Sequence, residues 1–275
     1  MRALPLTPSS DQYKKDPSFM SNTSPKKRTP VIVALSAIIV ICLAGAITGG
    51  VYVLNANKQI ADAENAANIT PSTPEPTLEE NPIDFDSLRK ESKGIYAWIY
   101  VPGTKVNYAV CQSKDNSYYL DHNEKREKSV LGAIFSETYN AKDFQDPVTI
   151  LYGHNGAKNA MFGSLHKFSD KGFFKEHKEM YVYAPGHVYT YKIISAYTTN
   201  NRHLMGAYNF YNPDQLAAFQ EQVKNPSSVD KNVRKKVELD ASSKLLVLST
   251  CNTGALAKSA RYLVIGVMTH DQPTK

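Results

Sequence analysis

The sequence is poor in cysteine, with three among 275 residues: Cys42, Cys111 and Cys251. An odd set cannot pair completely, and Cys42 lies inside an apolar segment, so at most one disulfide can form. We expect none, because an exported domain with one reactive thiol should avoid a second partner. The composition, 42% hydrophobic and 21% charged, permits one good-sized globular domain plus appendages and excludes a disordered or repeat protein.

Two further patterns are missing. No pair of histidines with a carboxylate has metal-ligand spacing, so we expect neither a metal site nor a cofactor. The first 30 residues contain six basic and two acidic groups, which supply +4 of the net charge of +6. The rest of the chain has no basic stripe interleaved with aromatic residues. This placement is typical of a cytoplasmic flank and argues against a nucleic-acid partner.

One long hydrophobic run is present. Residues 31–54 are apolar and carry no charge, which is long enough to cross a hydrocarbon core of roughly 30 Å. Residues 1–30 are polar, and Lys26, Lys27 and Arg28 precede the run. We therefore expect a disordered cytoplasmic tail, then an uncleaved single-pass transmembrane anchor in the cell membrane, with everything after it extracellular.

A cleaved signal peptide is the alternative interpretation of this run. The small residues Ala61 and Ala63 permit cleavage, but the run is longer than a typical signal peptide core. Residues 55–82 contain Pro71, Pro74 and Pro76 among Thr, Ser and Glu, which predicts an extended linker. Residues 83–275 are then one folded domain.

Short apolar runs separated by turn residues dominate that domain and predict a mainly β fold. Residues 83–92 are expected to form a short helix on the domain, and residues 212–224 a second helix capped by Asp214, with Leu216, Phe219 and Val223 on one face. Eight short strands favour a closed or nearly closed β-barrel. The expected strands are Tyr96–Val101, Val106–Gln112, Leu131–Phe135, Val148–Tyr152, Met180–Ala184, Val188–Ala196, Lys244–Ser249 and Tyr262–Thr269.

Three reactive side chains follow or begin such strands. Cys251 ends the run that starts at Leu245, Arg261 opens the run Tyr262–Met268, and His154 follows the run Val148–Leu151. A thiol acts as a nucleophile only as the thiolate, so it needs a base and a positive neighbourhood. Adjacent strands would bring Cys251 and Arg261 to one rim.

The pattern Tyr-Gly-His-Asn at 152–155, Leu-Ser-Thr-Cys at 248–251 and Arg261 resembles the sortases, the membrane-anchored cysteine transpeptidases of Gram-positive bacteria. The resemblance is to class B, from about Ile83 to the C-terminus, and further segments carry it in order: 95–103, 118–120, 132–135 and 161–162. It implies a sortase-type eight-stranded β-barrel with an N-terminal helix, and a helix inserted between the last pair of strands.

The resemblance also implies roles for individual residues. Cys251 would be the nucleophile, His154 the general acid and base, and Arg261 the group that stabilises the oxyanion or holds the substrate. The walls of the substrate groove would be Asn116, Leu120 and Ser249. Cys111 is expected to be a core or half-buried thiol. The default for His122, His166, His177, His187, His203 and His270 is a solvated imidazole.

The implied reaction cleaves a C-terminal sorting signal after Thr and transfers the surface protein to a peptidoglycan amine. Signals of the Asn-Pro-x-Thr or Pro-Pro-x-Thr-Gly type both occur in the class, and the sequence leaves the motif, the acceptor amine, any iron-acquisition or pilus role and the oligomeric state open. A membrane-tethered cysteine hydrolase of another fold and an inactive cell-wall binding module are the rival hypotheses. No acidic residue is placed by motif to orient His154, so the resting protonation of the Cys251 and His154 pair also stays open.

Overall fold

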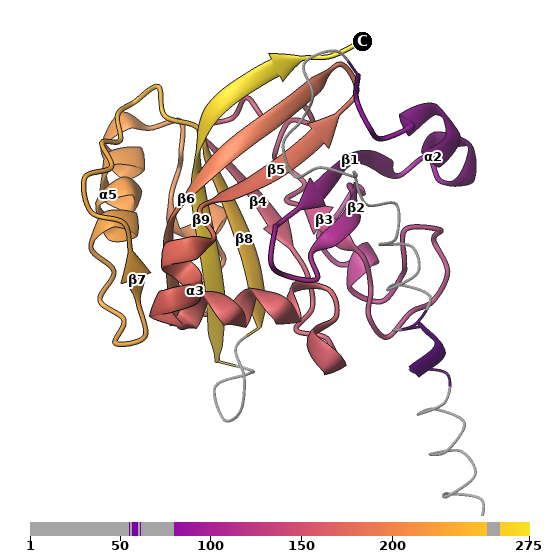
Figure 1. The fold of residues 1–275 in the computed structure, drawn as a ribbon, viewed down its shortest axis with the longest axis horizontal. Coiled ribbons are helices and arrows are strands. Elements are labelled where there is room, and N and C mark those ends of the chain that lie inside the picture. The colour runs from indigo at the N-terminus through magenta and orange to yellow at the C-terminus, as the bar shows by residue number, and fades with distance from the viewer. Residues whose placement is uncertain (1–54, 56, 60, 62–79, 252–258) are drawn as a thin grey trace, which may run out of the picture. The chain divides into compact units, whose positions relative to one another are not determined.

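The computed structural model describes residues 55, 57–59, 61, 80–251 and 259–275, with Cys251 described by its place in a strand (Figure 1). The strands are β1 (Ile95–Tyr100), β2 (Asn107–Cys111), β3 (Ile134–Ser136), β4 (Val148–Tyr152), β5 (Glu179–Ala184), β6 (His187–Asn200), β7 (Asn232–Val233), β8 (Leu245–Cys251) and β9 (Ala260–Pro273). The helices are α2 (Phe85–Glu91), α3 (Lys171–Glu176), α4 (Leu204–Ala207) and α5 (Pro213–Lys224), with 3-10 turns η1 (Tyr118–Leu120), η2 (Ala157–Asn159) and η3 (Phe162–Ser169).

Eight of these strands close into a barrel. The hydrogen-bonded order is β5-β1-β2-β3-β4-β8-β9-β6, and β6 pairs back with β5 to close the ring. The short β7 is attached to the outside edge of β6. The predicted mainly β, eight-stranded barrel is therefore confirmed. The two-residue strand β7 and the helices α3 and α4 were not expected from the sequence.

Strand β8 shows why its sequence is a continuous apolar run. Leu246 and Leu248 point into the central core of the barrel, whereas Leu245 and Val247 belong to a second core on the outer face, beneath α5. Successive strand residues face opposite sides, so a strand covered on both sides has no polar face. A third core lies outside β1, β2 and β5 and includes Phe85 of α2.

Helix α5 packs as its apolar spacing predicts, with Leu216, Phe219 and Val223 buried. Its cap was predicted incorrectly. The side chain of Asn212, not Asp214, accepts the backbone hydrogen bonds, from Asp214 N and Gln215 N at 3.1 Å each. Asn212 precedes a proline that occupies the first helical position, so Asp214 already lies within the first turn.

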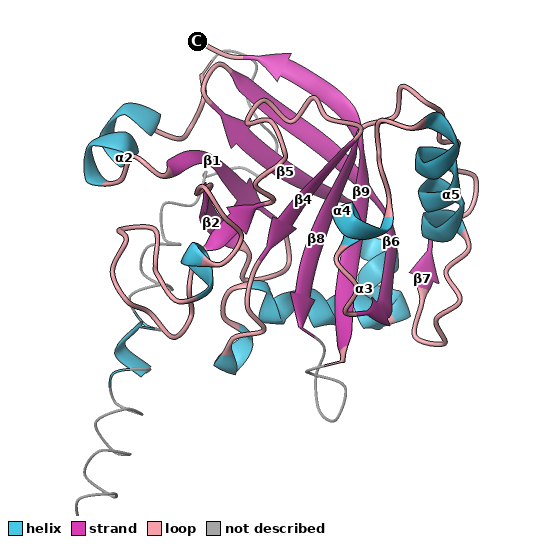
Figure 2. Cartoon of the chain, turned by 180° about the vertical axis from the view of Figure 1, so that it is seen from behind, coloured by secondary structure: helices cyan, strands magenta, loops and turns pink. Residues whose placement is uncertain are grey.

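Helix α5 lies where the sequence predicts it, over residues 212–224 and between late strands. It is inserted between β6 and β8, together with α4 and β7, and not between the last pair of strands, β8 and β9, as the resemblance implied (Figure 2). The helix predicted over residues 83–92 is confirmed as α2. None of the helices in the described part of the chain is long and apolar enough to cross a membrane, and the predicted anchor, residues 31–54, lies outside the described residues, as does the tail.

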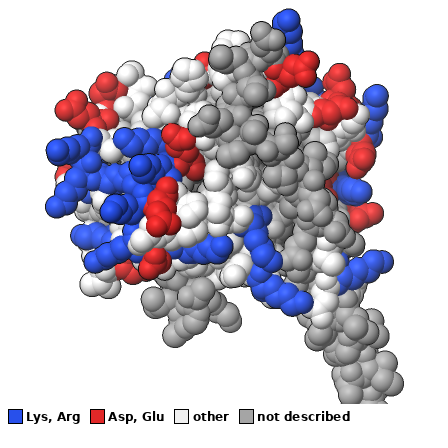
Figure 3. Space-filling model, in the orientation of Figure 1, with Lys and Arg blue, Asp and Glu red and all other residues white. Residues whose placement is uncertain are grey.

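Basic side chains gather on the face of the molecule that carries α5 and β7 (Figure 3). Lys235 and Lys236, which follow β7, are exposed. Arg234 between β7 and these lysines is half-buried, donates to the carbonyl oxygens of Ile193 (2.7 Å) and His177 (2.9 Å), and lies 4.5 Å from the ring centroid of Phe174. Through these contacts Arg234 links the segment after β7 to the barrel.

Candidate active site

The ends of β4, β8 and the start of β9 meet at one edge of the sheet. Strands β4 and β8 are parallel, with Tyr152 opposite Ser249, so both reach this edge with their carboxyl ends (Figure 2). Strand β9 returns antiparallel to β8, with Arg261 directly opposite Cys251. The backbones of Cys251 and Arg261 are therefore cross-strand neighbours, as the sequence pattern suggested.

Gly153 carries the chain from β4 to His154. Its backbone N–H donates to Ser249 O at 3.2 Å, which ties this turn to β8. A Cβ atom at Gly153 would come within 2.5 Å of Ile134 Cδ1 and 2.7 Å of the Phe162 ring. The space is filled by the apolar side chains of β3 and η3, so close packing of the core requires glycine here.

A backbone carbonyl orients His154. The ring atom Nε2 lies 2.7 Å from Leu120 O. A carbonyl oxygen only accepts hydrogen bonds, so Nε2 carries the proton in this contact and Nδ1 is the nitrogen left to accept one. The structure thus gives His154 an orienting partner where the sequence offered no acidic one.

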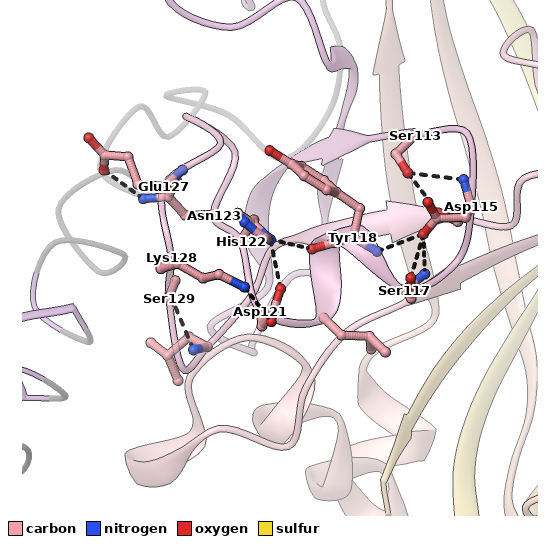
Figure 4. A network of polar contacts seen from close by, with 12 residues as sticks. Ser113, Asp115, Ser117, Tyr118, Asp121, His122, Asn123, Glu127, Lys128 and Ser129 are labelled. Carbon is pink, nitrogen blue, oxygen red and sulfur yellow. Dashed lines mark hydrogen bonds and ion pairs between the residues drawn. The ribbon is translucent and has the colours of Figure 1, made fainter.

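The connection between β2 and β3 holds Leu120 in place through its own polar network (Figure 4). Asp115 accepts hydrogen bonds from Ser117 N at 2.8 Å and Tyr118 N at 2.9 Å, which hold the turn that leads into η1. Farther along, the His122 ring stacks on Tyr118 with centroids 4.1 Å apart, and Nδ1 of His122 contacts Tyr118 O at 2.9 Å. These contacts fix the segment immediately on either side of Leu120.

A cleft of about 230 Å³ opens where these elements meet. It is lined by five of the predicted site residues: Asn116, Leu120, His154, Ser249 and Arg261. Leu120 is 46% exposed and so presents an apolar side chain at the cleft. Arg261 Nη1 donates to Ala260 O at 3.1 Å, which steers the guanidinium along the strand. The structure does not describe the Cys251 side chain.

Three residues of this region were not predicted to belong to the site. Tyr152 and His203 line the cleft, and both contact the buried carboxylate of Glu137, at 2.9 Å from the Tyr152 hydroxyl and 2.7 Å from His203 Nε2. The prediction that His203 is an ordinary solvated imidazole is therefore wrong. Its partner lies 66 residues earlier in the chain, so the sequence carries no signal for the pair.

Burial and hydrogen bonding shift the pKa of Glu137 in opposite directions. Burial favours the neutral form and raises the pKa of Glu137, but hydrogen bonds from Asn116, Tyr152 and His203 outweigh it and lower the pKa below its usual value. Burial, and then the neighbouring Glu137 charge, raise the pKa of Tyr152 far above its usual value. Glu137 is thus ionised at neutral pH, and Tyr152 remains a hydrogen-bond donor to it.

Cys111 does not line the cleft. Cys111 is free and fully buried at the end of β2, as predicted. Burial raises its pKa far above the usual value of a thiol, so Cys111 is not a nucleophile. Among the residues that the structure describes, no group of three or more His, Cys, Asp or Glu is arranged to hold a metal ion.

Comparisons with known proteins agree on one family. The sortase domain model matches residues 99–269. The chain is 32% identical to sortase B of Listeria monocytogenes over 184 residues, which cover 66% of this chain and 73% of that protein. A mutant form of Clostridium perfringens sortase B superimposes with a TM-score of 0.66 at 27% identity, covering 76% of this chain and 97% of that one. The Staphylococcus aureus sortase B-substrate complex gives a TM-score of 0.59 at 29% identity, covering 69% and 86%.

Proposed function

This chain belongs to the sortase family and is a cysteine transpeptidase of class B, and on that premise we propose that Cys251, His154 and Arg261 form its catalytic site. The observation that carries the proposal is the backbone register, in which Arg261 is the cross-strand partner of Cys251 at the edge where His154 also lies. A transpeptidase of this kind needs a thiolate, a proton carrier and a cation within reach of one carbonyl group.

The proposed reaction has two halves. In the first, the Cys251 thiolate attacks the Thr carbonyl carbon of a sorting signal, the peptide C–N bond breaks, and His154 gives a proton to the leaving amine. In the second, an acceptor amine gives a proton to His154 and attacks the thioester, and the C–S bond breaks to restore the thiolate. Because Nε2 is engaged by Leu120 O, we assign both proton transfers to Nδ1 of His154.

Arg261 would stabilise the negative charge that develops on the Thr carbonyl oxygen. A fixed charge-assisted donor in this role contributes about 3 kcal/mol to transition-state stabilisation. Arg261 is half-buried and lines the cleft, and partial exclusion of water strengthens such an interaction.

The substrates we propose are surface proteins that carry an Asn-Pro-x-Thr or Pro-Pro-x-Thr-Gly-like signal, and the acceptor is an amine of the peptidoglycan. Support comes from the Staphylococcus aureus relative, which has been solved as a substrate complex. We further propose that residues 31–54 anchor the chain in the cell membrane, with the cleft outside the cell. That part of the proposal rests on the hydrophobic run and on the basic residues before it.

Mass spectrometry of the full-length chain, purified in mild detergent and incubated with a panel of signal peptides and a simple amine, tests this function. We expect an amide product after Thr with one class of signal. Cys251→Ala should abolish it, His154→Ala should nearly abolish it, and Arg261→Ala should lower kcat/KM about a hundredfold or more.

The matched control is Cys111→Ala, which removes the other thiol of the barrel domain and should leave the product in place. Turnover that survives Cys251→Ala would overturn the proposed mechanism. Cleavage without amine transfer would instead favour a hydrolase, and no reaction with any peptide would favour an inactive binding module.

A further inference from the structure

Glu137 is a fully buried carboxylate that the proposed reaction does not use. It follows β3, and its side chain is 0% exposed. Three donors satisfy it: Asn116 Nδ2 at 2.5 Å on Oε1, and the Tyr152 hydroxyl at 2.9 Å and His203 Nε2 at 2.7 Å on Oε2. An ionised group is buried at this depth only when such donors replace its water shell.

The three donors come from three separate segments of the chain. Asn116 lies before η1 in the β2–β3 connection, Tyr152 ends β4, and His203 precedes α4 in the insertion after β6. All three line the cleft that holds His154 and Arg261. Glu137 therefore joins the parts of the cleft wall that the barrel strands alone do not connect.

The contact also fixes which way the Asn116 amide points. Its oxygen accepts from Thr138 N at 2.9 Å and from Thr138 Oγ1 at 2.8 Å, so the NH₂ group must face the carboxylate. One amide hydrogen is used by Glu137, which leaves the second for a ligand in the cleft. His203 is bound through Nε2, and its half-exposed ring has a second nitrogen that the carboxylate does not use.

We propose that Glu137 is a positioning residue for peptide recognition, holding Asn116 so that its second amide hydrogen binds a backbone carbonyl group of the sorting signal, and holding the Tyr152 and His203 rings as fixed walls of the cleft. An amide N–H suits a carbonyl oxygen, which an extended peptide offers along its length, whereas Tyr152 uses its one O–H proton and neutral His203 its one N–H in the contact with Glu137. This inference rests on the proposed function, because it concerns the same cleft. It assigns Glu137 to binding and not to the bond-breaking steps.

Steady-state kinetics with the peptide that the full-length chain processes test the proposal. Glu137→Gln removes the charge and replaces one carboxylate oxygen with an NH₂ group that faces either Asn116 or the pair Tyr152 and His203, so KM should rise tenfold or more while kcat changes less than about threefold. Glu137→Asp keeps the charge and should recover part of the affinity. The rate at which iodoacetamide alkylates Cys251, followed by mass spectrometry of the labelled peptide, should be the same in all forms.

His203→Gln supplies a second route should Glu137→Gln fail to fold. It should raise KM by itself, and the double variant should be no worse than Glu137→Gln, because the two residues act through one contact. The matched control is His187→Gln. His187 makes the same kind of pair with Asp271, at 2.7 Å, but it begins β6, whereas the cleft is lined by residues at and beyond the other end of that strand. Its KM should equal that of the wild type.

The outcomes separate this inference from the function on which it rests. A wild-type chain that forms no product from any peptide contradicts the proposed function first. If the wild-type chain processes a peptide but KM is unchanged in folded Glu137→Gln and His203→Gln, the positioning role alone is contradicted. Equal losses in kcat and in the alkylation rate of Cys251 would also overturn it, because they would show a general distortion of the site.

Discussion

The position of His154 depends on the glycine that precedes it. Gly153 has no Cβ, and the space that a Cβ would fill is occupied by Ile134 and Phe162. A glycine also permits close approach of the backbone or a substrate, and Gly153 lines the cleft. The nearest atoms, however, are core side chains, so the same residue lets the barrel core pack closely against the active-site turn.

Gly153→Ala should therefore destabilise the protein and displace His154. Forcing one methyl group into a packed core typically costs about 1–3 kcal/mol, and relaxation of the turn would lengthen the contact between His154 and Leu120. The melting temperature and kcat should both fall. Gly206→Ala in α4 is the control, because its Cβ would have no neighbour closer than 3.6 Å and alanine favours a helix. Equal melting temperatures for the two variants would contradict this account.

At the scale of elements, the β2–β3 connection takes the place of the Asn or Asp side chain that orients the histidine of a catalytic triad. It presents Leu120 O to His154, and its shape depends on the hydrogen bonds to Asp115 and on the stacked pair Tyr118 and His122 (Figure 4). A backbone carbonyl cannot change its protonation, so the orientation of His154 depends only on how well this segment is held.

Asp115→Ala should lower activity by loosening η1 and with it the Leu120 carbonyl. Losing a hydrogen bond to a charged group typically costs about 1.5–3 kcal/mol of stability. Asp84→Ala is the matched control, because Asp84 also accepts a backbone hydrogen bond at the start of a helix, from Ser87 N at 2.9 Å, on an element that does not line the cleft. We expect kcat to fall several-fold in Asp115→Ala and to stay unchanged in Asp84→Ala. A similar kcat in both would indicate that the hydrogen bonds to Asp115 do not act on His154.

The elements that the sequence predicted well are those specified by neighbouring residues. The eight strands and α5 follow from local apolar spacing, and the adjacency of Cys251 and Arg261 follows from a ten-residue separation between consecutive strands. The contacts that failed are those between distant segments. Glu137 and His203 meet only because β3 and the insertion after β6 converge on the cleft, and Asn212 replaced Asp214 as cap because a single proline shifted the helix start.

For the molecule as a whole, the buried ion cluster links stability to pH. The barrel has one central core and two outer cores, and the described carboxyl groups whose pKa departs from its usual value are all shifted downward, among them Glu137 inside the structure. A carboxyl group whose pKa is lower when folded stabilises the folded state at pH values above its unfolded pKa. That contribution is lost as the pH falls through the folded pKa.

The contribution of Glu137 to the stability of the wild-type chain should therefore be constant from pH 7 down to the unfolded pKa of glutamate, 4.5, and should fall below that pH as Glu137 takes up a proton and gives up its donors. Glu137→Gln resembles the protonated state at every pH, so it should be less stable than the wild type at pH 7 and should lose less stability on acidification.

Urea unfolding midpoints between pH 7 and 3 measure the stability of the wild type and of Glu137→Gln as a function of pH. They should converge at low pH, because the variant has no charge left to lose at this position. Curves that stay parallel to pH 3 would show that the acid sensitivity lies in other carboxyl groups, such as Asp230, whose pKa is lowered by hydrogen bonds from Ser228 and Thr198 despite the opposing effect of burial.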